Sequence, residues 1–389
     1  MNRAFIPILM AVALDLVGFG IVIPLLTFYA EEYAASAVEV TLLMAVYSLA
    51  QFLMAPVWGG LSDRFGRRPI MLISLTGAAL CLVGFAAADT LWLLFLFRTL
   101  HGGAAANIAT AQACVADLLP PEDRAKGMGL IGAAFGFGFT VGPFIGGELS
   151  TFGLVVPIWV AAGLSAVNLL LAIWWLPETR KPSTVRVPRP IGPQSLIRVM
   201  RHPVVGLCIV LTFVMTIAFA IMESSFTLFA EHVRDLGPIL VGRMFGVAGL
   251  TMIIVQGGLI GRLVKRFGEA ALVPVGVAIL AIGLGLLPLA PPPGMMVAVF
   301  VLIAIGHGIA SPSLHSLISR GTSDDEQGLV LGTNQSLSAL ARAVGPSMSG
   351  VMFTAAAALP FFASAGILAV CVPLSITAVR RRNRSVPAA

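Results

Sequence analysis

The chain is a succession of long apolar stretches separated by short polar segments. A helix needs about 20 mostly apolar residues to cross the hydrocarbon core of a bilayer, and twelve stretches approach that length. They lie near residues 5–28, 40–61, 70–88, 91–118, 126–149, 152–176, 204–230, 240–262, 270–290, 295–319, 327–350 and 355–380. The pattern predicts an all-α integral membrane protein with 12 transmembrane helices.

Composition agrees with this pattern. Of the 389 residues, 58% are hydrophobic and 11% are charged, and the mean hydropathy is +0.97. An average soluble domain is roughly 25% charged. A soluble fold is therefore excluded.

The positions of the basic residues indicate the orientation, because Lys and Arg near helix ends are retained on the cytoplasmic side. With the N-terminus inside, only Arg234 and Arg243 of the 24 basic residues fall outside, and Arg98 and Arg342 lie within predicted helices. We therefore expect both termini to be cytoplasmic, in a multi-pass protein of the inner membrane. The net charge of +6 is a topology signal, and nucleic acid is not an expected partner because no segment has the features of a nucleic-acid module.

Each of the four cysteines stands alone in apolar surroundings. Their spacing fits neither a zinc site nor a redox motif, so we expect them to serve packing. No metal and no cofactor is predicted. An enzyme is the least expected class, because no Ser, His and Asp set and no phosphate loop is present.

A proline-rich and basic segment divides the chain into two halves. The division predicts a six-helix bundle over 1–176, a cytoplasmic linker over 177–203 and a second six-helix bundle over 204–389. Internal similarity supports it: residues 59–64 recur at 257–262, and Val141-Gly142-Pro143 recurs as Val344-Gly345-Pro346. Repeats of this kind are typical of transporters that hold the substrate between the halves and rock around it.

Residues 59–69 form a glycine-punctuated turn with one acid and three bases. Glycine permits positive φ or close approach, and an acid here can lie at a helix N-terminus or pair with a guanidinium. The stretch resembles the signature loop of the major facilitator superfamily. The resemblance implies a cytoplasmic gate that latches the two halves when the protein is open outward, although the bases could merely enforce topology. Its members would be Gly59, Asp63, Arg64, Gly66, Arg67, Arg68 and Asp117, with Glu122 and Asp123 as further partners for the bases.

The fifth apolar stretch is rich in glycine, with Gly138, Gly142 and Gly146 spaced by four on one helix face. Small residues at that spacing permit close helix crossing in lipid. With Pro143 and Gly147, the run resembles the antiporter motif of drug-exporting facilitators, which favours export over uptake. The alternative is that this is simply a packing helix.

Asp15 lies near mid-membrane in the first stretch, in a run that resembles the opening helix of the same exporters. A carboxylate there costs on the order of 2.5–3.5 kcal/mol on insertion scales, so it should face a partner or a watery cavity. Arg98 and His101 of the fourth stretch are candidates, within a run that is similar to the family's arginine motif. Arg98 cannot lose its proton, so we expect it to tune the acid or, alternatively, to form a fixed structural pair with Asp15.

Glu223 in the seventh stretch resembles the acid that exporters of this superfamily use for proton coupling and for cationic drugs. A carboxylate whose exposure to water changes can alternate between protonated and ionised states. It could instead line an exit or pack against a polar neighbour. His307 and His315 could relay protons or merely satisfy hydrogen bonds, and Arg342 could meet an acid or the substrate.

These interpretations predict a proton-coupled antiporter that exports small amphipathic compounds or drugs by alternating access. Proton-coupling residues would be Asp15, Glu223, Arg98 and His307, and substrate-binding residues would be Phe19, Tyr47, His101, Phe135, Met222, Phe226 and Arg342. The resemblance comes closest to tetracycline-type exporters over residues 10–150. Those exporters carry an acid in the third helix where this chain has Cys81, so tetracycline itself is doubtful.

Two alternatives stay open. The same scaffold could export sugars, amino acids or lipid-like metabolites, and a pH-independent flux would indicate a facilitator. A non-transporting receptor or scaffold is a second alternative, which the intact signature loop and the intramembrane charges disfavour. The expected partners are a small-molecule substrate, protons and the lipid bilayer, and we expect a monomer.

Overall fold

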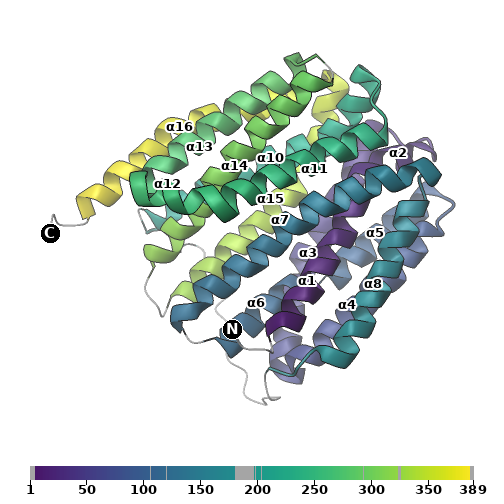
Figure 1. Cartoon of the computed structure of the whole chain (residues 1–389), viewed down its shortest axis with the longest axis horizontal. Coiled ribbons are helices and arrows are strands. Elements are labelled where there is room, and N and C mark those ends of the chain that lie inside the picture. The colour runs from purple at the N-terminus through teal and green to yellow at the C-terminus, as the bar shows by residue number, and fades with distance from the viewer. Residues whose placement is uncertain are drawn as a thin grey trace. The chain divides into compact units, whose positions relative to one another are not determined.

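The computed structural model is built from α-helices, with no strand in the part of the chain that it describes (Figure 1). The described residues are 5–105, 107–119, 121–179, 197, 199–202, 204–291, 293–322 and 326–385. The principal helices are α1 (Phe5–Val22), α2 (Leu26–Glu31), α3 (Ala37–Phe65), α4 (Arg67–Ala86), α5 (Leu91–Ala104), α6 (Asn107–Leu118), α7 (Pro121–Leu149), α8 (Val156–Trp175), α10 (Val205–Arg234), α11 (Pro238–Ile254), α12 (Ile260–Phe267), α13 (Glu269–Leu286), α14 (Gly294–Arg320), α15 (Gln327–Ala355) and α16 (Leu359–Ser385). The all-α prediction is confirmed.

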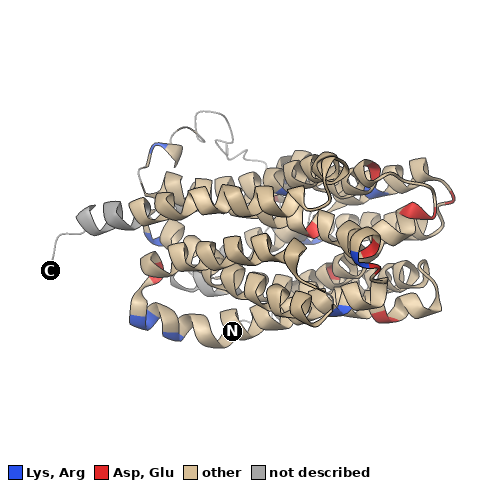
Figure 2. Ribbon diagram, turned by 90° about the horizontal axis from the view of Figure 1, so that it is seen from above, with Lys and Arg blue, Asp and Glu red and all other residues tan. Residues whose placement is uncertain are grey.

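Within the described residues, ten helical segments are long and apolar enough to cross a membrane. The two predicted stretches outside this set, 91–118 and 327–350, are helical as well: α5, which ends at Ala104, and α6 form the first, and α15 contains the second. Charged residues lie mostly at helix ends, and the middle of the helices is nearly free of them (Figure 2). This is the distribution that a bilayer requires, because a charge in hydrocarbon is costly.

Local sequence explains where several helices begin and end. At the start of α3, Ser36 and Glu39 form a reciprocal capping box, in which the Ser36 backbone N–H donates to Glu39 Oε2 at 2.8 Å. Pro24 coincides with a 3₁₀ turn between α1 and α2. Between α3 and α4 the chain turns at Gly66, whose φ of +99° suits glycine.

The predicted loop over 59–69 is wrong in its extent. Residues 59–65 continue α3 as a helix, and the break is confined to Gly66. The Ser62 hydroxyl donates to the Gly59 carbonyl at 2.9 Å, and Asp63 pairs with Arg67 one turn later at 2.8 Å. The first contact lies within α3 and the second joins α3 to the start of α4, so Gly59 and Gly60 do not end the helix and Gly66 does.

The chain divides into two compact units by its contacts. Unit 1 comprises residues 1–187 together with 230–249, and unit 2 comprises 188–229 and 250–389. The end of α10 and most of α11 therefore pack with the N-terminal helices. The division into halves at 177–203 stays a prediction, and most of that linker lies outside the described residues.

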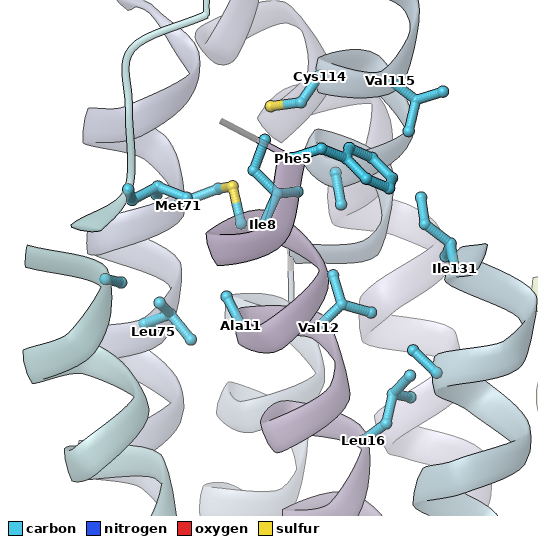
Figure 3. Packing of buried hydrophobic residues seen from close by; sticks show 14 residues of the cluster. Phe5, Ile8, Ala11, Val12, Leu16, Met71, Leu75, Cys114, Val115 and Ile131 are labelled. Atoms are coloured by element: carbon cyan, nitrogen blue, oxygen red, sulfur yellow. The ribbon is translucent and has the colours of Figure 1, made fainter. Parts of the chain in front are cut away.

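In unit 1 the core surrounds α1. Phe5, Ile8 and Val12 are fully buried and meet Met71 of α4 and Val115 of α6 (Figure 3). Helices α7 and α8 also pack along α1. The first helix is thus largely covered by its own unit, and its one polar side chain, that of Asp15, is half-buried.

Unit 2 is built around α13, which packs against α14 and α16. Phe226 of α10 packs against Phe300 of α14 with ring centroids 4.3 Å apart and the ring planes tilted by 59°. The hydroxyls of Ser224 in α10 and Ser349 in α15 lie 2.7 Å apart. A buried hydroxyl pair of this kind satisfies two polar groups in an apolar interior.

Candidate functional site

A cation held among aromatic rings lies inside unit 1. The Arg98 guanidinium of α5 lies over the Tyr47 ring of α3 at 4.6 Å and over the Phe19 ring of α1 at 5.5 Å. The Phe19 and Tyr47 rings are 4.9 Å apart, and His101 meets Tyr47 at 5.2 Å. Arg98 is only 2% exposed. The structure therefore brings together four residues that the sequence singled out from three separate helices.

Asp15 lies in the same helix as Phe19, one turn before it, and is half-buried. One turn before Asp15, the Ala11 carbonyl accepts a hydrogen bond of 2.8 Å from the Asn168 side chain of α8. Phe139 of α7, 6.2 Å from Phe19, adds a further ring to the group. We call Phe19, Tyr47, Arg98, His101 and Phe139 the Arg98 cluster; the pairing of Asp15 with Arg98 stays a prediction.

The predicted site residues of unit 2 are spread over three helices. Glu223 is half-buried in α10 and neighbours the buried Ser224. His307 of α14 stacks on Phe219 of α10 with ring centroids 4.6 Å apart. Arg342 lies in α15, where it is half-buried.

Three predicted ligand-binding residues take part in packing. Met222 and Phe226 are 1% and 0% exposed, and Phe226 is covered by Phe300. Phe135 packs against the core of unit 1. His315, which was a weaker candidate, meets the Ser311 carbonyl at 2.8 Å and the Asn334 side chain at 3.4 Å. A role of Met222, Phe226 and Phe135 in ligand binding stays a prediction.

The signature residues gather at one end of unit 1, which we call the Arg67 end. Arg67 is 2% exposed and pairs with Asp63 and with Asp117 of α6, each at 2.8 Å. It also donates to the Ser62 hydroxyl at 2.6 Å. Arg64 instead lies over the ring of Phe65, at 5.0 Å. The side chains of Glu122 and Asp123 lie outside the described set.

Sequence reasoning missed Glu178, which follows α8. Its carboxylate accepts from the backbone N–H groups of Arg67 and Arg68 at 2.9 and 3.2 Å. An acid at this position satisfies unpaired N–H groups at the first turn of α4 and complements its dipole. The Arg68 guanidinium donates to the Ile173 carbonyl at 2.7 Å, so α4 and α8 are joined twice. An isolated acid beside a proline-rich linker offered no signal for this contact.

The glycine face of α7 lies directly against α1. A methyl group placed on Gly142 would lie 2.7 Å from Gly20, and Gly138 and Gly146 meet Leu16 and Ile21 in the same way. Such contacts are shorter than any Cβ tolerates. The backbones of the two helices therefore touch along the antiporter motif.

The same helix contacts α11 at the opposite end of unit 1, which we call the Glu31 end. Gly147 lies against Gly242, and the Gly242 position also faces the Pro143 carbonyl. Nearby, the Arg243 guanidinium binds the carboxylate of Glu148 with two hydrogen bonds, at 2.6 and 3.2 Å. Glu148 was not among the predicted residues, although it directly follows Gly147.

All four cysteines are free thiols. Cys114, Cys208 and Cys371 are buried, and Cys81 is partly buried. The Thr179 hydroxyl lies 3.4 Å from the Cys114 sulfur. The side chains are thus placed as packing groups.

The model of the Major Facilitator Superfamily matches residues 8–346, with a second match over 258–387. Tetracycline resistance protein, class C, of Escherichia coli is 35% identical over 381 residues, which cover 96% of each chain. Multidrug resistance protein 2 of Bacillus subtilis (strain 168) is 25% identical over 391 residues, covering 97% of this chain and 96% of that one.

Two solved structures of transporters superpose on this chain. The human organic anion transporter MFSD10 (TETRAN) superposes with a TM-score of 0.74 at 26% identity, covering 96% of this chain and 99% of that chain. A bacterial homologue of the human lysosomal transporter Spinster superposes with a TM-score of 0.77 at 17% identity, covering 99% and 98%, which speaks for the fold. With the family model matched over most of its length, this chain belongs to the Major Facilitator Superfamily.

Proposed function

We propose that the chain is a proton-coupled antiporter of the inner membrane that exports small amphipathic compounds by alternating access. The observation that carries the proposal is the Arg98 cluster, in which a buried guanidinium lies over two aromatic rings. The relatives of this chain include tetracycline and multidrug resistance proteins. Flat rings and a fixed cation suit a planar ligand with an anionic or strongly polar edge.

In this proposal Asp15 and Glu223 are the exchanging carboxylates. Each lies within a membrane-spanning helix and is half-buried. A carboxylate loses its charge on taking up a proton, so its free energy in an apolar setting depends on protonation. Arg98, which keeps its charge, would be the residue that tunes the Asp15 carboxylate.

The positive charge of the Arg98 cluster indicates which class of ligand it would bind. Arg98 holds a permanent positive charge there, and the sequence has Cys81 where tetracycline-type exporters carry an acid. A purely cationic drug would be repelled by Arg98 and would gain nothing at Cys81. We therefore expect anionic or zwitterionic aromatic compounds to be exported in preference to cations.

Export of organic anions without proton coupling is the second candidate. It is favoured by the same Arg98 cluster and by the likeness to the human organic anion transporter. Sugars and amino acids fit less well, because the described part of the Arg98 cluster is mainly aromatic. The two candidates differ in whether flux depends on a pH gradient.

The decisive experiment reconstitutes the purified protein in liposomes with an imposed pH gradient. Flux of fluorescent anionic, zwitterionic and cationic aromatic compounds is compared among wild type, Asp15→Asn, Glu223→Gln and the exposed control Asp89→Asn. Antiport predicts that gradient-driven flux is lost in the first two variants and kept in the control. Flux that is equal in all four proteins and independent of the gradient would leave the organic-anion facilitator, and no flux with any compound would favour a receptor.

A further inference from the structure

The short helix α12 of unit 2 has one apolar face and one basic face. The apolar side chains pack against a core cluster of unit 2, and they are Ile260, Leu263 and Val264. The basic side chains are exposed, and they are Arg262, Lys265 and Arg266. Residues three and four apart lie on the same face of a helix, so the three bases form a single patch. We call Arg262, Lys265 and Arg266 the α12 patch.

The internal repeat provides a counterpart for this region. Arg64-Phe65-Gly66 recurs as Arg266-Phe267-Gly268, 202 residues later. The local structure recurs as well: the two glycines have φ of +99° and +75°, and each arginine lies over the ring of its phenylalanine, at 5.0 and 5.3 Å. The two turns are therefore equivalent, and their charges can be compared position by position.

At the first turn, acids accompany the bases. Arg67, directly after the glycine, is buried and pairs with Asp63 and Asp117, each at 2.8 Å. The Glu178 carboxylate binds the backbone of the same turn. Three acids thus stand beside the three bases of segment 59–69.

At the second turn, the signs are reversed and the acids are fewer. Glu269 takes the place of Arg67 and is buried. It pairs with Arg320 at 3.1 Å. Lys265 takes the place of Asp63. No acid in the described part of the chain forms an ion pair with the α12 patch, so its three positive charges have no counter-charge there.

The length of the helical segment that ends in α12 brings the patch to the membrane surface. The segment is Pro238–Phe267, with 30 residues, or about 45 Å at roughly 1.5 Å per residue. The hydrocarbon core of a bilayer is about 30 Å thick, and the headgroups increase this to about 40–45 Å. The last turns of the segment therefore reach the headgroup layer, on the cytoplasmic side if both termini are cytoplasmic as the charge bias predicts.

Exposed apolar side chains lie beside the bases. Phe267 is 54% exposed and Leu259 is 42% exposed. Basic residues next to Phe and Leu are typical of helices at the boundary between headgroups and acyl chains, where bases attract anionic lipids. A soluble anion would leave both apolar side chains in water, so a lipid fits this surface better.

We propose that the α12 patch binds the headgroup of an anionic phospholipid. The lipid phosphate accepts hydrogen bonds from the guanidinium and ammonium groups of the patch, and the acyl chains lie along Leu259 and Phe267. The lipid supplies the negative charge that Asp63 and Asp117 supply at the first turn. The site requires neither substrate nor proton, so the inference goes beyond the proposed function and is tested without transport.

The test measures lipid binding to the purified, delipidated full chain by native mass spectrometry. The probes are phosphatidylglycerol and phosphatidylcholine with equal acyl chains, and glycerol 3-phosphate as a phosphate without chains. We expect wild type to bind phosphatidylglycerol about 5-fold or more tightly than phosphatidylcholine. Glycerol 3-phosphate should not compete with the lipid.

Variants locate the site. Each of Arg262→Gln, Lys265→Gln and Arg266→Gln should weaken phosphatidylglycerol binding about 5-fold, and the triple variant should lose the preference. Arg266→Lys keeps the charge and should keep most of the affinity. Arg64→Gln is the matched control, because Arg64 has the same contact with a ring but follows Asp63; it should bind lipid like wild type. Thermal unfolding in lipid-free detergent should be the same for all variants, since these side chains are exposed.

Several results would overturn the proposal. Wild type could bind both lipids equally, which is informative even if a variant misfolds. The preference could survive in the triple variant, or Arg64→Gln could lower it as much as Arg266→Gln, and either result would indicate a general attraction to basic residues. Competition by glycerol 3-phosphate would assign the patch to a soluble anion. Lipid binding only after Asp324→Asn and Asp325→Asn would mean that these acids, which lie outside the described residues, neutralise the patch.

Discussion

Arg98 illustrates how a charged residue is accommodated within a membrane-spanning bundle. Its guanidinium lies 4.6 Å from the Tyr47 ring and 5.5 Å from the Phe19 ring. A cation over an aromatic face gains about 0.5–1 kcal/mol when exposed and about 2 or more when desolvated. The two rings therefore offset part of the cost of burial.

The rings of the Arg98 cluster should matter more than their polar groups. Tyr47→Phe keeps the aromatic face and should change substrate affinity by less than about 2-fold, whereas Tyr47→Leu removes it and should weaken affinity about 10-fold or more, since 1.4 kcal/mol corresponds to tenfold. Binding is measured by fluorescence titration of an anionic aromatic compound. Equal losses in the two variants would assign the effect to the hydroxyl.

At the Arg67 end we expect a large contribution to stability from one side chain. Arg67→Ala removes the cation between the carboxylates of Asp63 and Asp117, whose negative charges then repel each other. Breaking a buried ion pair costs about 3–5 kcal/mol of stability. Both acids are partly exposed, so we expect a cost at the lower end of this range. Thermal unfolding in detergent should show a lower Tm than wild type. The exposed control Arg64→Ala should leave Tm nearly unchanged, and a similar loss in both variants would contradict this account.

Among the helices, α7 shows close packing on two sides, because it contacts α1 on one face and α11 near its end. Helix association in lipid lacks a hydrophobic driving force and depends on close packing. The glycine spacing of four predicts such a face, and the structure agrees with it. The partner α1 could not be deduced, since a small face accepts any helix of matching shape.

Two glycines of α7 provide a matched comparison. In Gly142→Leu the new Cβ would lie 2.7 Å from the Gly20 Cα. A Cβ on Gly132 would meet no atom within 4 Å. Overpacking typically costs about 1–3 kcal/mol and more where backbone cannot move. Size-exclusion profiles should show little folded Gly142→Leu protein and normal amounts of Gly132→Leu; equal yields would mean that α1 and α7 separate easily.

In the whole molecule, residues 230–249 pack with the N-terminal helices rather than with the remainder of their own half. The Gly147 contact with Gly242, the Glu148 pair with Arg243 and the Glu31 pair with His232 all involve this region. The alternating access that we propose would require this packing to be broken and re-formed in each cycle. We therefore expect the Glu31 end to move during transport.

Crosslinking tests that expectation. Glu148→Cys combined with Arg243→Cys, joined by a short cleavable bis-thiol reagent in a background without native cysteines, should stop export, and reduction of the reagent should restore it. Each single cysteine variant treated with the same reagent should transport normally. Undiminished flux in the crosslinked protein would show that the Glu31 end need not open.

Hydropathy and composition were enough to predict an all-α membrane protein and the bounds of most helices to within a few residues, although the separation of α5 from α6 was not predicted. Mid-helix polar residues such as Asp15, Arg98 and Glu223 also stood out, because charge is rare in lipid. The extent of α3 past Gly59 was predicted wrongly, since glycine content indicates a break in general while Ser62 and Asp63 satisfied the helix locally.

The sequence by itself thus determined the class of fold, the helix positions and the set of intramembrane polar residues, because exclusion of polar groups from lipid acts on each segment separately. Only the tertiary structure decided which of them meet: Arg98 with Phe19 and Tyr47, Glu178 with the start of α4, and Glu31 with His232. Such pairings depend on the packing of helices distant in the chain, and no local pattern encodes them.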